Sequence, residues 1–103
     1  MKIVKKASFA ACAILLAFNV QAGTSSGKVT TMIINASNFL FFTAGTKTGS
    51  PTCGNNNQWA INLATAQGKT IYALLLSAQA QDKTVSVFGN NTCNNWGDRE
   101  DVL

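Results

Sequence analysis

The sequence predicts a single α+β domain: a small antiparallel sheet of four to five strands with one helix and one disulfide. Three observations predict it. Short runs rich in β-branched and aromatic residues are separated by turn-forming stretches, as in a small sheet. One segment, residues 68–81, carries apolar residues at helical spacing. Two cysteines remain once an N-terminal export signal is set aside.

Residues 1–22 have the pattern of a secretory signal peptide. Three lysines precede the apolar run of residues 7–18, and Val20-Gln21-Ala22 then supplies a loose small-x-small cleavage site. We therefore expect cleavage after Ala22, a mature domain over residues 23–103, and an exported protein that is secreted or periplasmic. A retained anchor is the alternative. The apolar run is shorter than the about 20 residues that span a membrane, so no membrane span is expected in the mature form.

Removal of the signal peptide would remove most of the positive charge. The whole chain carries eight Lys and Arg against four Asp and Glu, a net charge of +4. Three of the lysines belong to the signal, which leaves the mature domain with five basic residues, near +1. The charge therefore gives no reason to expect nucleic acid or an anionic membrane as a partner.

Cys53 and Cys93 are the cysteines of the mature domain. In a small exported domain such a pair predicts one disulfide, with two free thiols as the alternative. In the chain-entropy model, closing a loop of about 40 residues stabilises the fold by roughly 4 kcal/mol. Two cysteines without any histidine supply only half of a tetrahedral zinc site, so we expect no metal and no cofactor.

The first part of the mature chain predicts a hairpin followed by a long loop. Residues 23–27 form a small polar leader, and residues 28–35 form a β-branched first strand. After a polar turn, residues 39–43 (FLFFT) form a second strand. This strand lacks polar alternation, which predicts that both of its faces are covered, by the domain or by another subunit. Residues 44–57 form a loop rich in Gly and Asn that Cys53 would hold in place.

The helix predicted over residues 68–81 is expected to plug the open side of the sheet. Its start is ambiguous, because Thr70 could cap it or the helix could begin near Ala66. Its apolar stripe follows the i, i+3, i+4, i+7 pattern and consists of Ile71, Leu74, Leu75 and Ala78.

Three further strands are expected around the helix. Residues 58–63 precede it, and residues 84–88 follow it with Val85 and Val87 facing inward. Residues 102–103 would begin a short fifth strand after the polar loop that contains Cys93.

Catalytic chemistry is poorly supported. The chain has no histidine, so the commonest general base is missing. Asp98, Glu100 and Asp101 could meet as paired carboxylates. A solvated, charge-balanced end of the chain with Arg99 is the interpretation that we favour. We predict that the protein is not an enzyme and has no catalytic residues.

A binding function fits the composition better. Sugar hydroxyls need paired donors and acceptors, and the C–H face of a sugar stacks on an aromatic ring. The chain offers many asparagines together with Trp59, Trp96 and Tyr72. The alternative for the tryptophans is structural: Trp59 would belong to the core, and Trp96 would pack over the disulfide.

Several short motifs resemble the B subunits of the subtilase cytotoxin and pertussis-like toxin family. In chain order, these motifs are Ser26-Gly27-Lys28-Val29, Phe41-Phe42, Cys53 followed by Trp59-Ala60, Tyr72-Ala73-Leu74, Gln81-Asp82-Lys83 and Val85-Ser86-Val87. The resemblance implies an oligosaccharide-binding-type (OB-like) barrel, a homopentamer that accompanies a catalytic toxin subunit, and binding of a cell-surface glycan that is sialylated. Residues 93–98 (CNNWGD) also resemble the ends of small uncharacterised exported bacterial proteins, which imply no function.

The family's sialic acid contact carries over to Ser26, which occupies the matching serine position. Thr24, Ser25 and Phe88 are its candidate neighbours. The family's aromatic contact falls near Gly89 in this chain, one residue after Phe88. Where the family has a cysteine on the second strand, this chain has Phe42-Thr43. The predicted function is a non-enzymatic, exported glycan-binding module. The alternative is a periplasmic or secreted structural or inhibitory protein that binds a protein partner.

Overall fold

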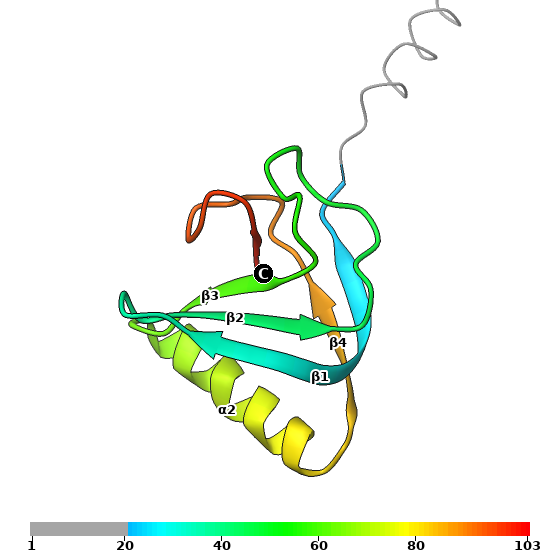
Figure 1. Cartoon of the computed structure of the whole chain (residues 1–103), viewed down its shortest axis with the longest axis vertical. Helices are drawn as coiled ribbons and strands as arrows, with labels where there is room; N and C mark the ends of the chain where they lie inside the picture. Colours follow the sequence, from blue (N-terminus) through cyan, green and yellow to red (C-terminus); the bar gives the residue numbers. More distant parts are fainter. Residues whose placement is uncertain (1–20) are drawn as a thin grey trace, which may run out of the picture.

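The computed structural model describes residues 21–103, so residues 1–20 of the predicted signal peptide lie outside the described part of the chain. The element order is strand, strand, strand, helix, strand, strand (Figure 1). The bounds are β1 Thr24–Ile34, β2 Phe39–Ala44, β3 Trp59–Asn62, α2 Ala66–Ala80, β4 Thr84–Phe88 and β5 Glu100–Asp101.

The five strands form one curled sheet in the order β4-β1-β2-β3-β5. The long strand β1 makes the curl possible, because its first half pairs with β4 and its second half pairs with β2. The register shifts between Val29 and Thr31, and such a bulge bends a strand and increases its twist. At the other edge, Leu103 N donates to Phe88 O over 2.9 Å, so the end of the chain returns to β4. The predicted OB-like partial barrel with one helix and one disulfide is thereby confirmed.

One strand pairing differs from the expected antiparallel sheet. β5 lies parallel to β3, with Trp59 opposite Glu100 and Ala60 opposite Asp101. The fifth strand also comes two residues earlier than predicted, and Val102 instead forms a single bridge to Gly89. The sequence pattern could not show this, because two acidic residues do not resemble a strand.

Helix α2 covers the open side of the sheet and contacts β1, β3 and β4 (Figure 1). The Thr65 side chain caps its N-terminus by accepting a hydrogen bond from Gly68 N at 2.9 Å. The start near Ala66 is therefore correct, and Thr70 is inside the helix, where its hydroxyl donates to the carbonyl oxygen of Ala66. Gly68, Leu75 and Ala78 are the buried residues of the helix.

Leu74 departs from the predicted apolar stripe, because its side chain is 65% exposed. The stripe is rotated toward the half-buried Ile71 and Tyr72, which pack on the core together with Leu75. Replacing Leu74 with Gln should therefore change the free energy of unfolding by about 0.5 kcal/mol or less, since the side chain buries little surface. Urea unfolding would measure this, and a loss above 2 kcal/mol would contradict the exposed placement.

The polar leader predicted over residues 23–27 is not a leader, since β1 begins at Thr24. Its backbone pairs with β4, and Thr24 N and Thr48 N each donate to the carbonyl oxygen of the other residue, at 2.9 and 2.8 Å. A serine- and threonine-rich segment without apolar alternation can be a strand where backbone pairing on both sides satisfies its amide groups.

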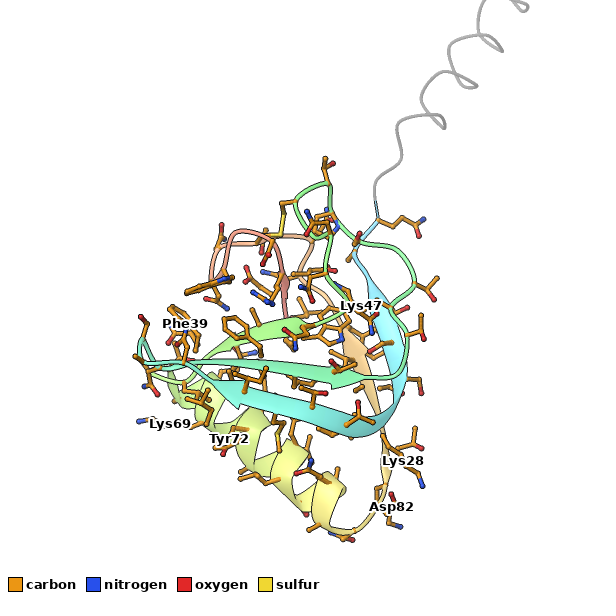
Figure 2. All side chains as sticks on the ribbon, viewed as in Figure 1. Lys28, Phe39, Lys47, Lys69, Tyr72 and Asp82 are labelled. Carbon is orange, nitrogen blue, oxygen red and sulfur yellow. A yellow bond between two sulfur atoms is a disulfide. The ribbon has the colours of Figure 1, made fainter. Side chains whose placement is uncertain are left out.

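Both faces of β2 are covered by the domain itself. Leu40 and Phe42 point into the core, and both are fully buried. On the opposite face, the ring of Trp96 meets those of Phe39 and Phe41 edge-on, at centroid distances of 5.9 and 5.2 Å. Figure 2 shows Phe39 at the end of β2, below the C-terminal loop. Trp96 therefore packs on these phenylalanines, and the apolar strand does not need a second subunit to cover it.

The predicted disulfide between Cys53 and Cys93 is confirmed, with the two Cα atoms 6.3 Å apart. It joins the long loop between β2 and β3 to the loop that follows β4 (Figure 2). Two segments without regular structure are thus tied together at one end of the curled sheet.

Candidate functional site

The first half of β1 and the end of β4 place four polar and aromatic residues on one outer face. Thr24 lies opposite Phe88, and Ser26 lies opposite Ser86, in the antiparallel register. Because side chains alternate along a strand, these four residues share a face. The pairing explains how Ser26 and Phe88, more than 60 residues apart in the chain, come together.

These residues line an open hollow of about 440 Å³, which we call the hydroxyl hollow. Its lining is completed by the loop after β2 and consists of Thr24, Ser25, Ser26, Thr46, Thr48, Ser86 and Phe88. The mutual backbone hydrogen bonds of Thr24 and Thr48 hold this loop against the strand. The hollow therefore has one wall from the sheet and one wall from a loop that is fixed to it.

The groups of the hydroxyl hollow are available to a ligand. The ring of Phe88 is 59% exposed, and Thr24, Ser26 and Ser86 are exposed as well. Within residues 21–103, Ser25 is the one member whose side chain hydrogen-bonds to another protein group. The lining contains no charged side chain. Recognition here would rest on hydroxyl groups, backbone groups and one ring.

Ser25 faces the other way. It is 7% exposed, and its hydroxyl oxygen accepts a hydrogen bond from Trp59 Nε1 at 3.0 Å. The sequence placed Ser25 beside Ser26 as a candidate contact, but the alternation of the strand turns its side chain toward the core. Ser25 supports the hollow from behind.

A second depression lies at the N-terminal end of α2 and has an amide-rich lining. This amide hollow measures about 250 Å³, and its polar side chains are Asn62, Thr65, Gln67, Asn90, Asn94, Asn95 and Asp101. The buried carboxylate of Asp101 organises the loop beside it by accepting hydrogen bonds from Asn94 N and Asn95 N at 2.8 and 3.0 Å. The lining includes no aromatic ring, so it offers hydrogen bonds without a stacking surface.

The acidic end of the chain is not the solvated segment that the sequence indicated. Glu100 is fully buried, and Asp101 is 5% exposed. Their carboxylates accept hydrogen bonds from the backbone amides of Gly23, Asn91, Asn94 and Asn95 and from the Thr92 hydroxyl. Arg99 pairs with Asp98 at 3.0 Å and also lies over the Phe41 ring. The carboxylates are buried because they hold the C-terminal loops to the sheet.

Two of the three aromatic residues considered as a sugar platform belong to the hydrophobic core. Trp59 is fully buried, and Tyr72 is partly buried against the core cluster. Trp96 is 38% exposed, but its ring packs edge-on against Phe39 and Phe41. Phe88 is the ring with the open face. Thr46, Thr48 and Ser86 were not predicted from the sequence, and the strand register alone would have identified only Ser86.

No helix within residues 21–103 has the length and apolar character needed to cross a membrane. Comparisons of the chain with protein-family models, with curated proteins and with solved structures find no match. The similarity to toxin B subunits therefore stays a prediction, and the candidate site rests on the geometry of the hydroxyl hollow.

Proposed function

We propose that the protein is a non-enzymatic glycan-binding module that holds a sugar in the hydroxyl hollow. The observation that carries the proposal is the register of β1 against β4, which sets the exposed Phe88 ring beside the free hydroxyls of Thr24, Ser26 and Ser86. A sugar presents the complementary surface, since its hydroxyls pair with side-chain hydroxyls and its C–H face packs on a ring.

The lining also bears on the kind of glycan. The hydroxyl hollow has no charged side chain, and Lys28, further along the same face of β1, pairs with Asp82 at 2.8 Å (Figure 2). A sialic acid carboxylate would have to be bound by hydroxyl and backbone donors. The serine position shared with the toxin B subunits supports that arrangement, and neutral sugars are equally compatible with the lining. The binding test must therefore include both sialylated and neutral glycans.

A glycan array with sialylated and neutral glycans tests the proposal on the exported, oxidised protein. Ser26→Ala should weaken binding by about two- to tenfold, because one hydrogen bond contributes about 0.5–1.5 kcal/mol. Phe88→Ala should weaken it by about tenfold or more, since it removes the stacking surface. Ser37→Ala is the matched control, because Ser37 is exposed in the turn between β1 and β2, and it should leave binding unchanged.

The outcomes separate the alternatives. If both Ser26→Ala and Phe88→Ala still bind glycan, the binding site lies outside the hydroxyl hollow. The amide hollow would then be the next surface to mutate. Absence of binding to any glycan, with the fold verified by circular dichroism, would overturn the lectin proposal. The remaining function would then be binding of a protein partner, which the apolar groove of about 210 Å³ between α2 and β4 favours.

A further inference from the structure

The backbone nitrogen of Gly23 lies in an unusual position, over a buried carboxylate. It is 3.1 Å from each of the two oxygens of Glu100, and Gly23 is itself buried. The carboxylate has two further partners, Asn91 N at 2.9 Å from Oε2 and Lys47 Nζ at 3.3 Å from Oε1. Gly23 N therefore sits symmetrically in the fork of a fully buried glutamate.

This geometry suits an amino group better than a peptide group. A backbone amide carries one hydrogen, which must be shared between the two oxygens at equal distance. A protonated α-amino group carries three hydrogens and a positive charge, so it can donate a separate, charge-assisted hydrogen bond to each oxygen. As long as Gly23 is joined to Ala22, its nitrogen supplies one donor hydrogen for the two carboxylate oxygens of Glu100.

The balance of buried charge leads to the same conclusion. The carboxylates of Glu100 and Asp101 are both buried, and the Lys47 side chain, only 6% exposed, is the buried cation among the described residues. Lys47 Nζ makes no hydrogen bond in this arrangement, and it also lies 4.2 Å from the centre of the Trp59 ring. Figure 2 shows Lys47 in the interior, beside β1. Buried charges are costly unless they are paired, and one more cation would balance the two carboxylates.

The space around the nitrogen admits only glycine. A Cβ atom on Gly23 would lie 2.6 Å from Glu100 Oε1 and 2.6 Å from the carbonyl oxygen of Gly49. A Cβ on Gly89 would overlap the same carboxyl group from the other side. The residue that packs here without a side chain is also the first residue after the cleavage site predicted at Ala22.

We propose that removal of the leader at the Ala22–Gly23 bond creates a buried ion pair between the new α-ammonium group of Gly23 and the carboxylate of Glu100. In this step water adds across the peptide bond, the carboxylate stays on Ala22, and the released amine of Gly23 takes up a proton. The ion pair then joins the start of β1 to β5, near the two ends of the mature chain. A chain that keeps its leader has only the amide hydrogen bonds of Gly23 at this position, without the ion pair, and is less stable once folded.

The mass of the exported protein gives the first test. The full chain, expressed in an exporting bacterial host and purified from its exported fraction, should have the mass of residues 23–103. Its N-terminal peptide should begin at Gly23. A different first residue would overturn the proposal.

The reactivity of the amine gives the second test. Limited acetylation with an activated acetyl ester at pH 7 is compared between the Gly23-started protein and a chain whose cleavage is moved upstream so that it begins at Ala22. The buried amine of Gly23 should react at least about tenfold more slowly, with the exposed Lys69 and Lys83 as internal standards. Equal rates in the two chains would show that the amine is free, and the ion pair would be refuted.

Thermal unfolding separates the ion pair from simple burial. The Gly23-started protein should melt about 5 °C above the Ala22-started chain. The same comparison in a Glu100→Gln background should show little difference, because the neutral amide does not attract the ammonium group. A difference that persists undiminished in that background would overturn the charge pairing. If Glu100→Gln fails to fold, equal acetylation rates in the Gly23-started and Ala22-started chains would still refute the ion pair. Neither result depends on whether the protein binds a glycan.

Discussion

Replacing Trp59 with alanine is expected to lower the free energy of unfolding by about 4 kcal/mol, because a large buried aromatic residue leaves a cavity that the core cannot refill. Trp59 is fully buried within the hydrophobic core cluster. Its indole nitrogen donates to the buried Ser25 hydroxyl at 3.0 Å, and Lys47 Nζ lies over its ring. The substitution therefore removes packing, a hydrogen bond and a cation–π contact at one place.

Trp96→Ala is the matched control for this experiment. Trp96 is 38% exposed and contacts Phe39 and Phe41 only with edge-on geometry, so its loss should cost about 1 kcal/mol. Urea unfolding followed by circular dichroism measures both variants. If Trp59→Ala is unfolded in buffer, Trp59→Phe supplies an intermediate loss that can be measured. Equal losses for the two tryptophans would contradict the placement of Trp59 in the core and Trp96 at its edge.

The regular elements of this fold could be predicted because their apolar residues repeat with the periods of strands and helices. The run at 39–43, the alternation around Val85 and Val87, and the helix between them follow from local patterns. The disulfide followed from counting cysteines in a small domain with a predicted export signal.

The elements that were missed are held by tertiary contacts without an apolar signature. The strand at Thr24 exists because β4 and the residues around Thr48 satisfy its backbone, and nothing in its serines and threonines indicates that. Glu100 and Asp101 look like solvent-exposed residues in the sequence. They are buried because backbone amides distant in the chain, including Gly23 N, converge on them.

Only part of the candidate site could be predicted from the sequence. Ser26 and Phe88 were named from the resemblance to toxin B subunits, and the strand register brings them to one face. Ser25 was named with them, but its inward direction follows from a strand that begins at Thr24, whereas the sequence pattern predicted a start at residue 28. Thr46 and Thr48 belong to an irregular loop, and no local pattern places such residues beside a strand.

The disulfide is expected to supply a large share of the stability of this domain. Replacing Cys53 and Cys93 together with serine should lower the free energy of unfolding by about 4 kcal/mol, since the unfolded chain regains the freedom of a loop of about 40 residues. A small domain has about 5–15 kcal/mol in total, so the variant should be only marginally folded at 37 °C. Urea unfolding of the oxidised protein, the reduced protein and the double variant measures the loss.

The position of the bond predicts where the domain will loosen first. Cys53 and Cys93 join two loops, whereas the pairing of β1 with β2 and β4 does not involve them. Amide hydrogen exchange should therefore accelerate at Asn94 and Asn95, whose amides are bonded to Asp101, before it accelerates in β1. A reductant should have no effect on the double serine variant, which is the control. If the loss of stability is below about 1 kcal/mol, the core alone holds the fold. If exchange rises equally in β1, the whole domain loosens together and the prediction of local loosening is wrong.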